Sequence, residues 1–136
     1  MKVDADKLFE LAKQARVNSH SPYSNFAVGA SLVTDDGQYY TGSNVENACY
    51  AMGQCAEASA IGGMITGGGR MIRAVMIVTD TAEPVFSCGG CLQRISEFAS
   101  ADTEVISATL NGKIETHKFT KLYPMAFTAK SLNANA

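Results

Sequence analysis

The chain has 136 residues, the size of one compact domain, and its 46% hydrophobic and 18% charged residues exclude an intrinsically disordered protein. A formal net charge of −2, without a local cluster of lysine and arginine, argues against a nucleic acid polymer as a partner. No apolar run reaches the roughly 18 residues of a membrane span, and the first residues lack the apolar segment of a signal peptide. We therefore expect residues 1–136 to form a single cytoplasmic domain with no membrane partner.

The first half of the chain predicts a helix followed by a β-hairpin. Apolar residues recur at helical spacing, so we expect an amphipathic helix that is capped by Asp4 or Asp6 and ends near Asn18. Apolar and smaller residues alternate over residues 26–32, which predicts a strand. Asp36-Gly37 supplies turn chemistry, and residues 38–42 can return as the partner strand. The polar segment 44–54 that follows is typical of a functional loop.

The second half predicts a parallel crossover unit. A short helix over residues 55–64 should end at the three glycines 67–69, where helix continuation is costly. Residues 74–79 form an almost unbroken apolar run, the pattern of a strand covered on both faces. A second helix over residues 88–98 then leads to a parallel strand over residues 104–108.

The remaining chain predicts an edge strand and a tail. Asn111-Gly112 marks a tight turn into residues 113–117, which we expect to form an antiparallel edge strand. A tail without a predicted element follows. No internal repeat and no linker interrupts the sequence.

Three of the four cysteines stand at predicted helix starts. Cys55 precedes one helix, and Cys88 and Cys91 lie in the first turn of the other, where unpaired N–H groups and the helix dipole favour thiolates. The two glycines between Cys88 and Cys91 let both sulfurs reach one ion. Three thiolate ligands predict a catalytic Zn²⁺ site, because a tetrahedral ion keeps its fourth position open to water. Cys49 lacks such a setting and is expected to be a packing residue.

Glu57 indicates that the predicted metal site is also a catalytic site. It follows Cys55 by two residues, and hydrolysis at an amidine-like carbon needs a proton carrier beside the activated water. A single carboxylate can take the proton of the water, hand it to a ring nitrogen and later protonate the departing amine. The competing interpretation of Cys88 and Cys91, a two-cysteine redox motif, leaves Cys55 and Glu57 unexplained.

Cys55-Ala56-Glu57 followed by Cys88-Gly89-Gly90-Cys91 resembles the zinc signature of the deaminase superfamily in its three-cysteine form. Segments 21–30, 42–50 and 122–127 resemble the substrate-binding segments and the tail of small homotetrameric cytidine deaminases, in the same order along the chain. The resemblance implies a three-layer α/β/α fold with a mixed five-stranded sheet. It also implies zinc-dependent hydrolysis of cytidine or deoxycytidine to uridine or deoxyuridine and ammonia, as in pyrimidine salvage.

The resemblance also implies roles for individual residues. Cys55, Cys88 and Cys91 would bind zinc, and Glu57 would be catalytic. The implied substrate contacts are the ring of Phe26, stacked on the pyrimidine; Asn44 and Glu46, at the ribose hydroxyl; Ala56; and Ala48, Tyr50 and Phe127, which would reach the substrate of a neighbouring subunit. A monomer would then be inactive. On spacing alone, Phe26 and Phe127 are more typical of core residues, and Asn44 and Glu46 are equally explained as residues that brace their loop.

The sequence departs from the family pattern at three positions. Ala58, Ser87 and Leu92 stand where the family usually has arginine, proline and arginine. Three thiolates outnumber the charge of one Zn²⁺, so other donors must neutralise the site: the helix N-termini, backbone N–H groups or Arg94. Two alternatives therefore stay open. One is a deaminase of a modified pyrimidine nucleoside or another aminated heterocycle, and the other is a non-catalytic, zinc-stabilised nucleoside-binding module.

Overall fold

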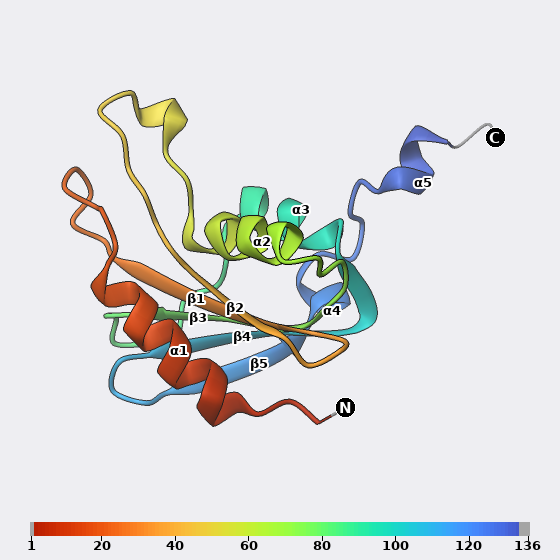
Figure 1. The fold of residues 1–136 in the computed structure, drawn as a ribbon, viewed down its shortest axis with the longest axis horizontal. Helices are drawn as coiled ribbons and strands as arrows, with labels where there is room; N and C mark the ends of the chain where they lie inside the picture. Colours follow the sequence, from red (N-terminus) through yellow and green to blue (C-terminus); the bar gives the residue numbers. More distant parts are fainter. Residues whose placement is uncertain (1, 134–136) are drawn as a thin grey trace.

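The fold has a central sheet with one layer of helices on each of its faces. The side chains of its strands point alternately to the two faces and pack against these helices. The computed structural model describes residues 2–133 (Figure 1). Its elements, in chain order, are α1 (Ala5–Val17), β1 (Val28–Thr34), β2 (Tyr39–Ser43), the 3-10 turn η1 (Tyr50–Met52), α2 (Ala56–Thr66), β3 (Ile72–Thr79), α3 (Gly89–Ser96), β4 (Ala99–Thr109), β5 (Ile114–Lys118), α4 (Phe119–Leu122) and α5 (Ala129–Leu132).

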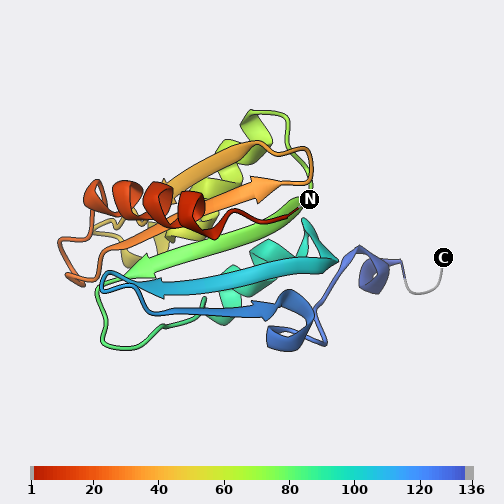
Figure 2. The ribbon, with the colours of Figure 1, turned by 90° about the horizontal axis from the view of Figure 1, so that it is seen from below.

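The five strands form one mixed sheet with the order β2-β1-β3-β4-β5. β1 pairs antiparallel with both β2 and β3, β3 runs parallel to β4, and β5 pairs antiparallel with β4. α1 lies across one face of the sheet, and α2 and α3 cover the other (Figure 2). The predicted three-layer α/β/α fold is confirmed, as are the hairpin, the parallel crossover and the antiparallel edge strand.

The apolar run of β3 (Ile72–Thr79) contributes side chains to the cores on both faces of the sheet. Ala74, Met76 and Val78 belong to the core cluster that includes Leu8 and Ala12 of α1. The residues between them, Val75 and Ile77, belong to the cluster that α2 and α3 cover. Successive side chains of a strand point to opposite faces, so an uninterrupted apolar sequence is what a strand between two helix layers requires.

Two glycines allow the helices to approach the sheet closely. A Cβ on Gly29 of β1 would stand 1.9 Å from the carbonyl oxygen of Ala12 in α1. A Cβ on Gly42 of β2 would stand 2.4 Å from the backbone nitrogen of Ala60 in α2. Any side chain at these positions would push a helix away from its strand. The position of α2 matters for the site described below, because Cys55 is its N-cap and Glu57 lies in its first turn.

The structure differs from the sequence-based expectation at several boundaries. β1 begins at Val28, so Phe26 lies in the preceding loop, where Asn25 adopts a φ of 56°. β4 begins five residues earlier than expected, and its residues 100–103 form an irregularity between the pairs Ile72–Ala99 and Ala74–Glu104. The loop and the tail also contain the short helices η1, α4 and α5. Within the described chain, no helix is long and apolar enough to cross a membrane.

Candidate active site

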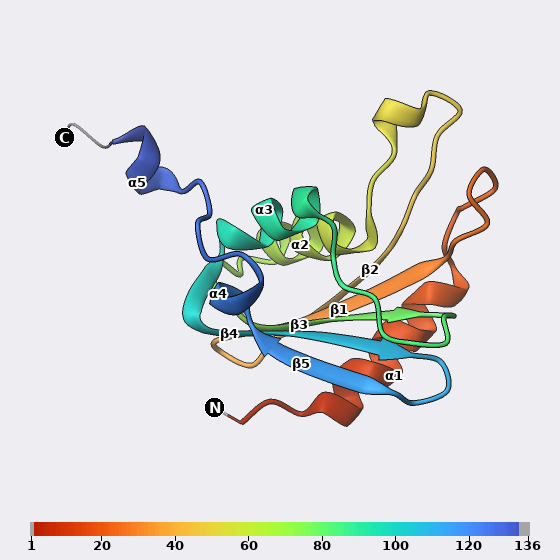
Figure 3. The same ribbon diagram turned by 180° about the vertical axis from the view of Figure 1, so that it is seen from behind.

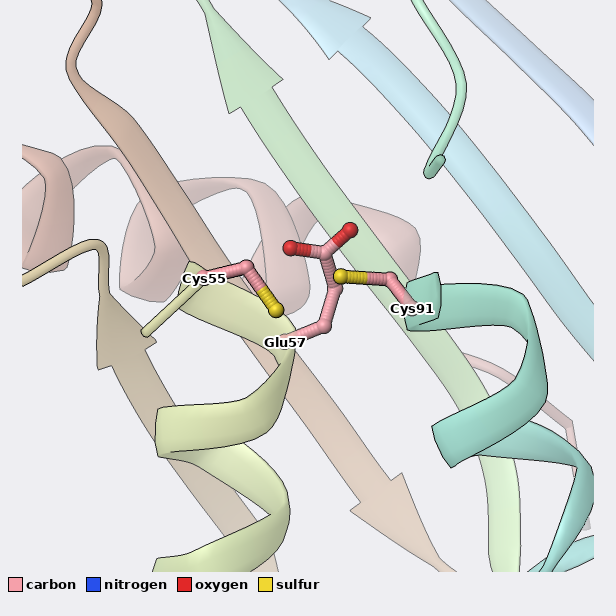
Figure 4. A group of neighbouring side chains, drawn as sticks. All are labelled: Cys55, Glu57 and Cys91. Carbon is pink, nitrogen blue, oxygen red and sulfur yellow. The ribbon is translucent and has the colours of Figure 1, made fainter. Parts of the chain in front are cut away.

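The N-terminal ends of α2 and α3 bring two sulfurs and a carboxylate together. The Sγ atoms of Cys55 and Cys91 and a carboxylate oxygen of Glu57 all lie within 4.8 Å of one another. Figure 4 shows the three side chains pointing toward one another from the two helices. Cys55 is the N-cap of α2, Glu57 lies in the first turn of the same helix, and Cys91 lies in the first turn of α3. Glu57 is only 4% exposed although it is an acid.

The two cysteines of this cluster shift each other's pKa in opposite directions. The Cys91 thiol donates to the sulfur of Cys55, and this contact is the main reason why the pKa of Cys55 falls to about 7. The N–H of Ala58 and the charge of Arg94 lower the pKa of Cys55 further, against burial and the Glu57 charge, which raise it. The same hydrogen bond, followed by burial, raises the pKa of Cys91. One thiolate therefore forms readily at this site, and a cation is needed to hold two.

Cys88 offers a further sulfur beside this cluster. It is the N-cap of α3 and lines the same cavity as Cys55, Glu57 and Cys91, although its sulfur is not one of the three clustered ligand atoms. Soft thiolates at two helix N-termini are the donors that zinc prefers, and the residues present therefore fit this metal. Cys49 is exposed rather than packed, so the expectation of a packing role is wrong.

The cavity beside the cluster has about 240 Å³ and is mainly apolar. Its remaining lining residues are Phe26, Val28, Ile77, Thr79, Val85, Phe86 and Ser87. The hydroxyl of Thr79 has a partner in Thr81, whereas the buried Oγ of Ser87 has none in the described structure. A small flat ring with one or two polar groups suits such a cavity. Sequence reasoning did not find Val85 and Phe86, whose only signal was their position just before Cys88.

Asn44 and Glu46 brace the loops beside this cavity. Asn44 accepts from the N–H of Val28 at 2.9 Å and from the hydroxyl of Ser19, and its amide donates to the carbonyl of Phe26 at 2.8 Å. It thereby fixes the segment that carries Phe26. Asn44 therefore braces another segment of the chain, and its contact with a ribose hydroxyl stays a prediction.

Glu46 holds the loop of residues 21–25 in the same way. Its carboxylate accepts from the hydroxyl and the N–H of Ser24 and from the N–H of Tyr23 at 3.0 Å. The hydrogen bonds from Ser24 are the main reason why the pKa of Glu46 is lowered from its ordinary value. This carboxylate is therefore ionised while it keeps lone pairs free for a further donor.

The other predicted contact residues lie away from the sulfur cluster. Tyr50 lines a second hollow of about 340 Å³ together with Glu46, and its ring is 5.7 Å from that of Tyr23. Ala48 is exposed on the same projecting loop. Phe127 is 56% exposed, and its carbonyl accepts from Gln93 at 2.7 Å. The loop with η1 and the tail with α5 extend beyond the sheet, as Figure 3 shows from behind.

Ala56 is fully buried in the core between α2 and the sheet. No part of Ala56 is therefore exposed to the cavity, and its contact with the substrate stays a prediction. Phe26 is the one predicted contact residue that lines the cavity of the sulfur cluster within this chain.

Comparisons with known proteins agree with this geometry. The family model described as "cytidine and deoxycytidylate deaminase zinc-binding region" matches residues 2–109. The cytidine deaminases of Sporosarcina psychrophila and Halalkalibacterium halodurans are each 40% identical to the chain over 131 residues, covering 96% of it and 96% and 99% of their own lengths. A crystal structure of cytidine deaminase from Burkholderia pseudomallei superposes with a TM-score of 0.87 at 38% identity, covering 92% of this chain and all of the other.

Proposed function

The chain belongs to the cytidine and deoxycytidylate deaminase zinc-binding family, and on this premise we propose that it hydrolyses cytidine or deoxycytidine to uridine or deoxyuridine and ammonia. The observation that carries the proposal is the cluster of Cys55, Glu57 and Cys91 at the converging ends of two helices. Sulfur donors and an acid 4% exposed in an apolar cavity are what metal-assisted proton transfer to a ring requires.

We assign the zinc to Cys55, Cys88 and Cys91. Bound zinc supplies the Lewis acid that lowers the pKa of a water molecule toward neutrality. The chain contributes the positive ends of α2 and α3, whose free N–H groups stabilise thiolates. The N–H of Ala58, which acts on Cys55, is one such group.

Glu57 would carry the protons of the reaction. Its carboxylate takes one proton from the attacking water and passes it to the ring nitrogen next to the amino-bearing carbon. It then takes the second proton of the water and gives it to the amino nitrogen, which leaves as ammonia. Because the side chain is buried beside the sulfurs, its two oxygens stay close to the reacting atoms through both transfers.

The walls of the cavity would hold the pyrimidine ring. Phe26 offers an aromatic face, and its loop is fixed by Asn44. Glu46 is held ionised and would accept from a ribose hydroxyl. Asn44, whose side-chain oxygen already accepts from Ser19 and Val28, would donate its second amide N–H to the ribose oxygen. The Ser87 hydroxyl, which is buried without a partner, would bond to the polar edge of the base.

The remaining predicted residues support a proposal about assembly. Ala48, Tyr50 and Phe127 are exposed on segments that project from the domain, and Tyr50 is 79% exposed. Large exposed apolar side chains on projecting segments are typical of protein interfaces. We propose a homotetramer in which these residues complete the site of a neighbouring subunit, and the four free cysteines fit a reducing compartment such as the cytoplasm.

The deciding experiment measures ammonia release by the zinc-loaded protein. The substrates are cytidine, deoxycytidine, cytosine, adenosine and a set of modified pyrimidine nucleosides. Release from cytidine or deoxycytidine supports the proposal. Release confined to another heterocycle would keep the reaction and replace the substrate. Calorimetric binding of cytidine without any release would contradict the proposal in favour of a non-catalytic nucleoside-binding module.

A further inference from the structure

The assigned zinc site carries more negative than positive charge. Three thiolates outnumber the two positive charges of Zn²⁺, so the centre carries a net negative charge inside a mainly apolar wall. Charge of this kind is stabilised by nearby donors that bond to the ligands. Ala58, next to Glu57, has no donor in its side chain, and only its backbone N–H acts on Cys55.

Arg94 brings a guanidinium to the site from the other helix. It lies on α3, three residues after Cys91. Its Nη1 atom is 3.3 Å from the point where a Cβ of Gly90 would stand, and the sulfur of Cys88 is 3.8 Å from the same point. The cation and the sulfur therefore border the same small space. Glycine at position 90 keeps this space open, because a side chain there would crowd the guanidinium.

No other interaction of Arg94 with residues 2–133 accounts for this position. Among the described residues it forms no ion pair, although Glu97 lies one turn further along the same helix surface. The Arg94 charge interacts favourably with the sulfur of Cys55. Both Ala58 and Arg94 line a groove of about 460 Å³ between α2 and α3. The small side chain of Ala58 thus leaves room for a cation that approaches from α3.

We propose that Arg94 is the positioning residue that neutralises the zinc–thiolate centre, donating its N–H groups to the sulfurs of Cys88 and Cys55 when the metal is bound. The proposal rests on the three-cysteine site of the proposed function. Arg94 acts through the ligands and does not touch the substrate. A fork of N–H donors suits this task, because it can serve two sulfurs at once.

The first test measures zinc affinity by competition with a chromophoric chelator, which requires no substrate. Arg94→Ala should bind zinc about 10- to 100-fold more weakly, the usual cost of losing a partner of a metal ligand. Arg70→Ala removes the same charge from the exposed loop after α2, where Arg70 bonds only to backbone carbonyls, and should leave the affinity unchanged. Equal affinities of the two variants would overturn the proposal.

The second test moves the cation to the other helix. Ala58→Arg introduced into the Arg94→Ala background should restore zinc affinity, because the groove gives an arginine at position 58 access to the same sulfurs. In the cobalt-substituted protein, the sulfur-to-metal charge-transfer band should shift in Arg94→Ala and return in the double variant. A double variant that stays as weak as Arg94→Ala would contradict the proposal, since a merely structural role of Arg94 would not be rescued from α2.

Variants of the three cysteines distinguish failure of this inference from failure of the proposed zinc site. If Arg94→Ala binds zinc normally while Cys55→Ser, Cys88→Ser and Cys91→Ser do not, the inference fails and the zinc site of the proposed function stands. If the cysteine variants also keep full affinity, the site itself is wrong. Circular dichroism and thermal unfolding of the metal-free Arg94→Ala protein should match wild type, because Arg94 is exposed.

Discussion

Cys55 and Cys88 occupy equivalent positions in two different helices: each is the N-cap residue, of α2 and α3 respectively, and neither side chain caps its own helix. N-cap side chains usually accept from the first N–H groups of the helix. Here both sulfurs are left available at the positive ends of the two helix dipoles. The two helices meet over the end of β3, where Ile77 and Thr79 form part of the cavity wall.

Replacing the sulfur ligands one at a time should remove the metal. Cys55→Ser, Cys88→Ser and Cys91→Ser should each lose most of the bound zinc, because a hydroxyl does not replace a thiolate as a zinc ligand. Mass spectrometry of the purified proteins measures the zinc content. Cys49→Ser is the matched control, since Cys49 is exposed outside the cluster and should keep full zinc. Retained zinc in Cys88→Ser would show that Cys88 is not a ligand.

Replacing the acid should separate chemistry from metal binding. Glu57→Gln should lower kcat about 10²- to 10⁴-fold while zinc content is unchanged, because the amide keeps the shape but does not accept the proton. Ammonia release and metal analysis on the same sample measure both effects. Glu10→Gln, in an exposed ion pair with Lys13 on α1, should behave as wild type. Loss of zinc together with activity in Glu57→Gln would indicate a ligand instead of a proton carrier.

The unpaired hydroxyl of Ser87 should have opposite effects on stability and on turnover. Ser87→Ala removes a buried polar atom without a partner, so the free protein should be unchanged or more stable by about 1 kcal/mol in denaturant unfolding. The variant should raise KM or lower kcat for cytidine, because the base loses a hydrogen bond. Unchanged kinetics with unchanged stability would mean that the hydroxyl serves neither substrate nor fold.

Acidification should loosen the loop that Glu46 holds. Its pKa is lowered from 4.5 in the folded chain, mainly by Ser24, so the ionised form stabilises the fold above 4.5. This contribution is lost as the pH falls through the lowered folded value. Amide exchange at Tyr23 and Ser24 should accelerate over that range relative to the core strands. Glu46→Gln should show the faster exchange already at neutral pH; equal exchange in both proteins would contradict the role of the carboxylate.

Mixing two inactive variants should restore activity if subunits share sites. Tyr50→Ala and Phe127→Ala should each reduce turnover strongly, although neither side chain lines the cavity of its own chain. Co-refolding either with Glu57→Gln should recover part of the wild-type rate, because some sites then combine intact halves from two chains. Sedimentation of the unmixed proteins gives the oligomeric state. No recovery from a verified mixed oligomer would place these residues outside the neighbour's site.

Features with a local signal could be predicted from the sequence. The apolar run of β3, the glycine stop of α2 at Gly67 and the Asp36-Gly37 turn each depend on residues close together in the chain. The separation of Cys55 from Glu57, and of Cys88 from Cys91, is also local, because one turn of helix fixes how such residues lie. The strand order came from the resemblance to a family.

Only the tertiary structure decided what long-range packing determines. The partners of Asn44 and Glu46 lie between Ser19 and Val28, and no spacing rule connects these stretches of sequence. The burial of the Ser87 hydroxyl depends on the walls that Phe86 and its neighbours build around it. Arg94 and Cys88 border the same space beside Gly90, and Arg94 lines a groove together with Ala58 of α2. These relationships arise where two helices pack over one sheet. The spacing of residues along the chain does not show which segments come together there.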